Sequence, residues 1–238
     1  MKRRIMTIVA LVLAITATAQ TVTLNSEKRE ESYVKTILER SEKAISDLKL
    51  SADKAEAVRN IIANRYFELN DIYAERDEFM ASLDSTIKGR DRVALTRGIN
   101  QECDSKLYRS HFAFAAQLGM FLTEDQIVAV KDAITYNKVK VTYDAYLDEI
   151  PSLKAEEKTQ ILAWLLEARE LALDAEGSKQ KHEVFNKYKG RINNFLSKQG
   201  YDLNKEREEW FKRLEERKAK EGDKQSKEEN KKEKKKKK

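Results

Sequence analysis

The stretch ILAWLLEARE, residues 161–170, is the part of the chain that decides the fold class. Ile161, Trp164, Leu165, Ala168 and the following Leu171 recur at the spacing that places side chains on one face of an α-helix. A helical period continues through most of the sequence. Seven glycines and one proline among 238 residues supply too few turns for an all-β or doubly wound fold. The sequence therefore predicts an all-α protein.

We expect a single domain of seven or eight helices between about Ser26 and Arg217. The clearest helix start is Thr123-Glu124-Asp125-Gln126, a capping box in which the threonine and glutamine side chains bond free amides. Residues 135–143 alternate weakly and could be extended, although their neighbours favour helix–loop–helix. The predicted helices are Ser26–Ile45, a long helix opened by Ser51 and ended by Gly89, Arg90–Gln117 closed by Gly119, Thr123–Ile134, Ala155–Asp174, Ser178–Lys198 stopped by Gly200, and Leu203–Ala219.

The first 19 residues have the pattern of a cleaved secretory signal. Three basic residues at positions 2–4 precede an apolar run over residues 5–15, and Ala17-Thr18-Ala19 gives a small-x-small cleavage site. The run is too short to span a bilayer. The cleavage site contains no cysteine, so a lipid anchor is not expected. We therefore expect a mature protein that begins near Gln20 and is periplasmic or secreted.

The C-terminal residues 222–238 contain no apolar side chain and are rich in lysine and glutamate. Such a composition cannot bury a core, so it predicts a disordered polybasic tail. A solvated tail that aids solubility is the favoured role, and electrostatic contact with an anionic membrane or polysaccharide is the alternative. The net charge of +6 arises at the ends, because residues 5–222 alone carry −2. A nucleic-acid partner is therefore not expected.

No catalytic, metal or cofactor signature is present in the sequence. There is no GxSxG elbow, no HExxH pair and no phosphate-binding glycine loop, and the only histidines, His111 and His182, lack metal-ligand spacing. Cys103 is the only cysteine, and its place on an apolar helical stripe predicts a buried thiol rather than a reactive one. We predict no catalytic residue, no metal and no cofactor, although paired carboxylates of a glycosidase type stay possible.

A sugar site combines flat apolar faces with hydrogen-bonding groups, and both kinds of side chain occur between residues 136 and 201. In this interpretation Arg169 and Arg191 clamp a ligand carboxylate. The alternatives are a core role for Trp164, which lies on the apolar stripe, and surface ion pairs for Arg169 and Glu170. The candidate ligand-binding residues are Tyr136, Tyr143, Trp164, Arg169, Glu170, Lys189, Arg191 and Asn194.

Several segments resemble one family of secreted bacterial proteins, the domain-of-unknown-function family "thirty-eight twenty-six", over roughly Ser26 to Arg217. They are LTEDQ at 122–126, VTY at 141–143 with Tyr146-Leu147, ILAWLLEARE at 161–170, KYKGRINN at 187–194 and GYDL at 200–203. The resemblance implies a secreted, sugar-binding protein, because members are described as sugar-binding and occur beside polysaccharide-degradation systems in Bacteroidota. Together with the export signal and the missing catalytic motifs, it predicts an exported, non-catalytic carbohydrate-binding protein linked to polysaccharide utilisation. The family has no established catalytic residues.

Two other functions stay open. The segment Leu-Thr-x-x-Gln at 122–126 resembles the motif of helical periplasmic stress chaperones, which implies a protein that holds unfolded clients. A polysaccharide lyase or hydrolase with catalytic acids or tyrosines outside any known motif is the third hypothesis. The expected partner is a carbohydrate, in particular an acidic polysaccharide fragment.

Overall fold

A computed structural model describes residues 21–236, and the predicted signal sequence lies outside these residues. The described residues form eight α-helices and one short 3₁₀-helix, η1 (Ser46–Leu48), with no strand among them, which confirms the all-α prediction. The α-helices are α1 (Glu31–Ile45), α2 (Ala52–Ser82), α3 (Gly89–Gly119), α4 (Glu124–Ile134), α5 (Lys138–Glu149), α6 (Ala155–Leu173), α7 (Ser178–Lys198) and α8 (Leu203–Lys236).

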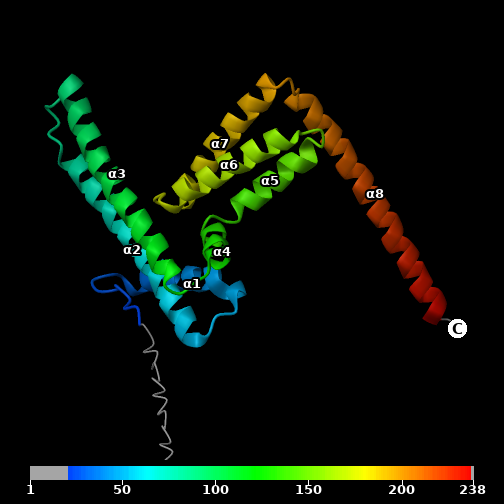
Figure 1. Ribbon diagram of the computed structural model, residues 1–238, viewed down its shortest axis with the longest axis horizontal. Coiled ribbons are helices and arrows are strands. Elements are labelled where there is room, and N and C mark those ends of the chain that lie inside the picture. Colours follow the sequence, from blue (N-terminus) through cyan, green and yellow to red (C-terminus); the bar gives the residue numbers. More distant parts are fainter. Residues whose placement is uncertain (1–20, 237–238) are drawn as a thin grey trace, which may run out of the picture.

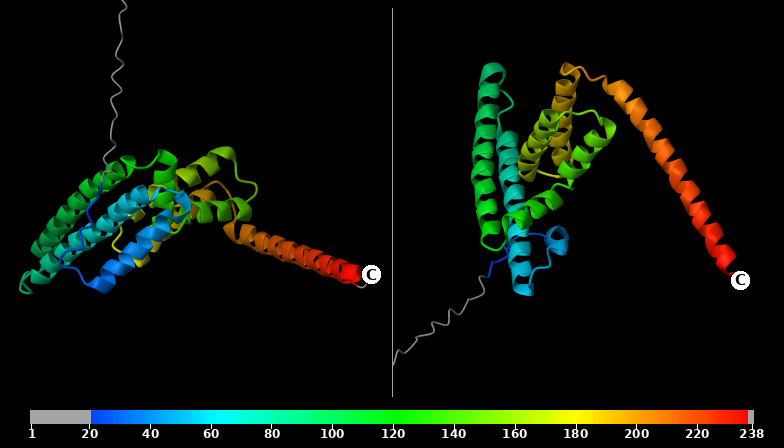
Figure 2. Two further views of the ribbon diagram at one scale, coloured as in Figure 1. Left: turned by 90° about the horizontal axis from the view of Figure 1, so that it is seen from below. Right: turned by 45° about the vertical axis from the view of Figure 1, so that its right-hand side comes forward.

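The helices are arranged in two groups with a third, projecting element (Figure 1). The long helices α2 and α3 form an antiparallel hairpin, and α1 packs against α2 near its start. Helices α5, α6 and α7 pack side by side as a second group, connected to the first through α4. Both views of Figure 2 show α8 leaving the second group and pointing away from the rest of the molecule.

Each group has its own hydrophobic core. In the second group, Ile161, Leu165 and Ala168 of α6 are fully buried against Ile192 and Leu196 of α7, which confirms the predicted stripe at these three positions of α6. The exception is Leu171, whose side chain is 52% exposed. Ala172 is buried in its place, because the face of α6 that meets α7 turns slightly along the helix. In the first group, Val58, Ile61 and Ile62 of α2 pack with Phe114 and Leu118 of α3.

Two predicted helix limits in the first group are wrong. The opening helix begins at Glu31 rather than Ser26, since Lys28 has a left-handed φ of 60° and residues 22–25 bond to α2 instead. Gly89 does not end the second helix, which stops at Ser82; with a φ of +62° it begins α3. Gly200, with a φ of +97°, follows the end of α7 as predicted, and this is a conformation that glycine adopts without strain.

The segment before α1 lies along α2 as a strap, held by asparagine side chains. The Nδ2 amide of Asn60 donates to the Val22 carbonyl at 2.8 Å, and that of Asn64 donates to the Thr23 carbonyl at 2.8 Å. Arg29 closes the strap with a two-armed ion pair to Asp71. These side chains satisfy carbonyl groups of the strap that no regular secondary structure satisfies.

Helix α8 continues to Lys236, through the segment for which the sequence predicts disorder. Lysine and glutamate are good helix formers, so the backbone of this segment is compatible with a helix although its composition offers no core residue. The disorder of residues 222–238 in solution stays a prediction. Among the described residues, no helix combines the length and the apolar character needed to cross a membrane.

Candidate functional site

An open groove runs along the exposed face of α7, beside Trp164 of α6, with a volume of about 800 Å³. We call it the α7 groove. Helix α7 contributes a lining residue at each turn, so the groove extends for roughly 16 Å along the helix axis. Three lining side chains are cationic and none is acidic. The lining residues are Trp164, Lys187, Tyr188, Gly190, Arg191, Asn194, Phe195 and Lys198.

The groove contains an aromatic ring held in a fixed position. Trp164 is half-buried and meets Phe195 edge to face, with 5.2 Å between the ring centroids and 88° between the ring planes. The guanidinium carbon of Arg191 lies over the Trp164 ring, 4.6 Å from its centroid, a favourable cation–π distance. Core packing on one edge and a cation on one face therefore fix the indole before any ligand arrives.

Gly190 opens the middle of the groove. It lies inside α7 with an ordinary helical backbone, and a Cβ atom built at this position would meet nothing within 4 Å. Glycine in a helix interior costs about 1 kcal/mol relative to alanine. Neither backbone conformation nor packing requires glycine here, and the missing side chain leaves open space at this point of the groove.

The polar groups of the groove are available to a ligand. Asn194 is exposed, and no hydrogen bond or ion pair joins its side chain, or those of Lys187 and Lys198, to another described residue. Arg191 makes an ion pair of 3.3 Å with Glu167, and both side chains are about half exposed. Burial and the neighbouring Glu167 raise the pKa of the Tyr188 hydroxyl to about 12, which keeps it a hydrogen-bond donor at neutral pH.

The structure brings three of the eight predicted ligand-binding residues into the α7 groove, namely Trp164, Arg191 and Asn194. Arg169 and Glu170 are elsewhere, in a charged network between the two groups of helices. Arg169 is 7% exposed and contacts Asp132 and Glu170, each at 3.0 Å. The predicted clamp between Arg169 and Arg191 is therefore absent from the groove.

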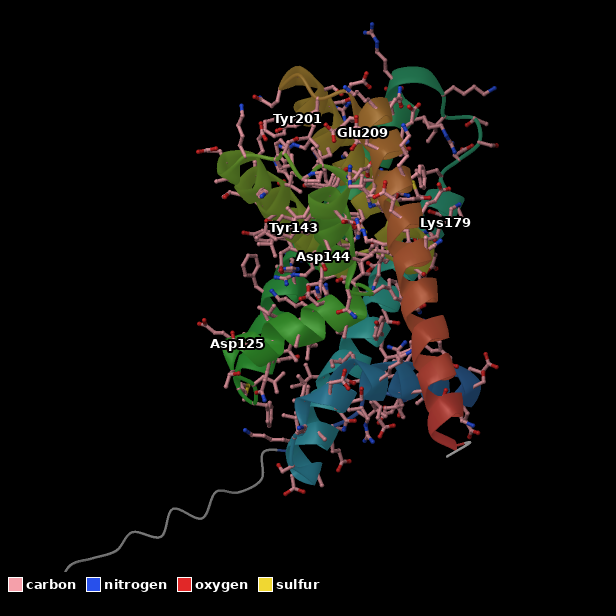
Figure 3. The ribbon with its side chains drawn as sticks, turned by 90° about the vertical axis from the view of Figure 1, so that its right-hand side faces the viewer. Asp125, Tyr143, Asp144, Lys179, Tyr201 and Glu209 are labelled. Carbon is pink, nitrogen blue, oxygen red and sulfur yellow. The ribbon has the colours of Figure 1, made fainter. Side chains whose placement is uncertain are left out.

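The remaining predicted residues lie in three separate places. Tyr136 follows α4 with a φ of 61° and stacks on His182, with 5.3 Å between the ring centroids. Tyr143 is half-buried on α5 against the core of the second group, next to the exposed Asp144 (Figure 3). Lys189 is exposed, and its carbonyl accepts a hydrogen bond from Tyr146 at 3.4 Å. None of these three lines the groove.

The charged network at the junction of α2, α3, α4 and α6 is centred on Asp174, directly after α6. Its carboxylate accepts hydrogen bonds from Arg65 at 2.5 Å and from Nδ1 of His111 at 3.0 Å. The other ring nitrogen of His111, Nε2, lies 3.6 Å from Glu170. One nitrogen of the imidazole thus faces Glu170 on α6 and the other faces Asp174 directly after α6. His111 therefore connects the hairpin to the second group.

Glu170 joins the same network to α4. Its side chain accepts a hydrogen bond from Lys131 at 2.7 Å and another from Arg169. Burial alone would raise the pKa of the Glu170 carboxyl, but the hydrogen bonds and charges of Lys131 and Arg169 hold it below the usual value. The network positions helices, and no group of histidine, cysteine and acidic side chains suited to a metal ion occurs among the described residues.

Sequence reasoning missed five lining residues as ligand contacts: Lys187, Tyr188, Gly190, Phe195 and Lys198. A signal for Lys187 and Lys198 was present, because residues 187, 191, 194 and 198 follow a spacing of four, three and four, which is one face of a helix. Gly190 was detectable too, as a glycine inside a helix without a capping role.

Comparison with known proteins supports the resemblance found in the sequence. No curated protein matches the chain. One family model matches residues 34–219, from within α1 to within α8. The chain therefore belongs to the family described as "Protein of unknown function (DUF3826)".

Proposed function

We propose that this protein is an exported, non-catalytic protein that binds carbohydrate in the α7 groove. The observation that carries the proposal is the combination of a fixed indole ring, an open position at Gly190 and unpaired polar side chains along one face of α7. Sugars present flat C–H surfaces to aromatic rings and hydroxyl groups to amides and charged side chains. The groove supplies both kinds of contact side by side.

The size of the groove supports an extended ligand. Its lining residues span about three turns of α7, a length that accommodates several linked sugar units rather than a single ring. The groove is open to solvent, so that a chain can enter from the side. A polysaccharide fragment fits this shape, and the link to polysaccharide utilisation follows from that ligand class.

The test is a screen of the purified protein against immobilised plant and bacterial polysaccharides, followed by calorimetry on each hit. Arg191→Ala should weaken binding by at least about 1 kcal/mol, the scale of a hydrogen bond from a charged group. Arg207→Ala is a matched control, since Arg207 is also 51% exposed and makes one 3.3 Å ion pair, with Glu149. No binding to any glycan, or equal losses in both variants, would contradict the proposal.

A second candidate function is a helical chaperone, favoured by exposed apolar side chains on the hairpin of α2 and α3. Tyr108 and Phe112 are 68% and 57% exposed, with 4.9 Å between their ring centroids. Exposed apolar surface of this kind marks an interaction site when it is contiguous. Suppression of aggregation of a reduced, unfolded test protein, lost in the double variant Tyr108→Ser and Phe112→Ser, would support this alternative. Unchanged aggregation in the presence of the protein would dismiss it.

A further inference from the structure

The ion pair between Arg191 and Glu167 lies at the edge of the α7 groove, between α7 and α6. It is a single contact, from Nη1 of Arg191 to Oε2 of Glu167 at 3.3 Å. A guanidinium group usually pairs with a carboxylate through two parallel N–H···O bonds. Glu167 therefore uses only part of the capacity of Arg191, and both side chains are about half exposed.

The rest of the groove favours negative charge. Lys187 lies one turn before Arg191 and Lys198 lies two turns after it, and neither has an ion-pair partner among the described residues. Among residues 21–236, Glu167 is the only carboxylate that forms an ion pair with any of these three cations. Opposite charges in a partly desolvated groove attract each other more strongly than in water.

We infer that Glu167 occupies the position of a ligand carboxylate, and that an acidic sugar unit displaces it and pairs with Arg191 through both guanidinium arms. This inference rests on the proposed function and adds the class of ligand, a glycan that contains uronic acids. The exchange is inexpensive, because exposed ion pairs contribute little to stability and Glu167 returns to water. Glu167 thereby sets specificity, because a neutral sugar leaves the Arg191–Glu167 pair in place and gains no binding energy from Arg191.

The experiment compares one ligand in two charge states. Calorimetric titrations use a trimer of galacturonic acid and its methyl ester, which has the same rings but no charge. We expect the acid to bind about tenfold more tightly than the ester, a difference of about 1.4 kcal/mol. Added salt should weaken binding of the acid and leave that of the ester unchanged.

A variant of Glu167 tests the displacement step. Glu167→Gln removes the internal competitor, so affinity for the acid should rise about threefold or more, while affinity for the ester stays the same. Glu183→Gln is the control, because Glu183 makes an ion pair within α7, with Lys179 at 4.0 Å, that is more exposed and does not involve a lining residue of the groove. We expect no change in binding of either ligand to this control.

The outcomes separate the two proposals. Equal binding of acid and ester, or no gain in Glu167→Gln, would overturn the inference and leave carbohydrate binding intact. Binding of a neutral glycan alone, lost in Arg191→Ala, would also overturn only the inference. No binding of any immobilised glycan would overturn the proposed function and the inference with it.

Discussion

Arg191 of α7 lies with its guanidinium carbon 4.6 Å from the centroid of the Trp164 ring, and this contact joins α6 to α7 at the surface of the second group. The two residues are 27 positions apart in the sequence, so the pair exists only because α6 and α7 pack closely. Phe195 also packs against the indole, edge to face. A ligand therefore meets side chains that are already in position, which lowers the entropy cost of binding.

Gly190→Ala should stabilise the protein. Alanine is favoured over glycine in a helix interior by about 1 kcal/mol, and the new Cβ meets nothing within 4 Å. Denaturant unfolding should show a higher midpoint with an unchanged slope. A lower midpoint would mean that Gly190 has a structural role in α7.

Lys181 gives the protein a pH-dependent stability on the alkaline side. It is 3% exposed and donates to the Ile134 carbonyl at 3.3 Å. Burial, together with the charges of Arg40 and Arg65, lowers the pKa of its amine to about 8, from the ordinary value of 10.5. Since the unfolded chain keeps the proton to a higher pH than the folded protein, the cost of a buried charge is full below pH 8 and fades towards pH 10.5.

Lys181→Met should remove this dependence. Between pH 7.5 and 9.5 the free energy of unfolding of the natural protein should rise by about 2 kcal/mol relative to the variant. Urea unfolding at several pH values measures the difference. Lys179→Met is the control, because Lys179 lies on the same helix and its side chain is 85% exposed. Parallel curves for the natural protein and Lys181→Met would contradict a buried, charged lysine.

Glu170 should contribute stability at neutral pH that is lost in acid. Because its folded-state pKa is lowered, the contribution is present above the pKa of the unfolded chain and disappears as the pH falls through the folded value. Glu170→Gln should cost about 1–3 kcal/mol at pH 7 and much less near pH 3. Glu167→Gln, at an exposed pair, should cost under about 1 kcal/mol. Equal costs in the two variants at pH 7 would count against the network.

Truncation after Gly222 should leave the fold unchanged. The removed residues contain no apolar side chain, so they contribute nothing to a hydrophobic core. Thermal unfolding followed by circular dichroism should give the same midpoint for both forms. Retention on anionic liposomes at low salt should drop if the tail binds anionic surfaces, with neutral liposomes as the control. A lower midpoint would show that residues 223–238 support the domain.

The sequence was sufficient for most helix limits. Helix α7 has the predicted bounds, and the capping box that opens α4 has both of its hydrogen bonds, between Thr123 and Gln126. These features depend on residues a few positions apart. Cys103, on the predicted apolar stripe, is buried at 6% exposure, and burial raises the pKa of its thiol.

Features that depend on distant partners were not predictable in the same way. The strap of residues 22–25 is bonded to Asn60 and Asn64, and nothing local in its sequence shows that these partners exist. Arg169 has the composition of a ligand-binding residue, but its position is decided by Asp132 on α4, 37 residues earlier. Trp164 has both of the roles that the sequence left open, because it packs against the core and also lines the groove.

The most direct test of the central claim blocks the α7 groove without altering the core. Gly190→Leu fills the open position beside Trp164, and Gly98→Leu makes the same change inside α3, where a Cβ likewise meets nothing within 4 Å. In a calorimetric titration with a glycan selected by the screen, we predict that Gly190→Leu loses binding at least tenfold and that Gly98→Leu binds like the natural protein. Unchanged affinity in Gly190→Leu would show that carbohydrate does not bind in this groove.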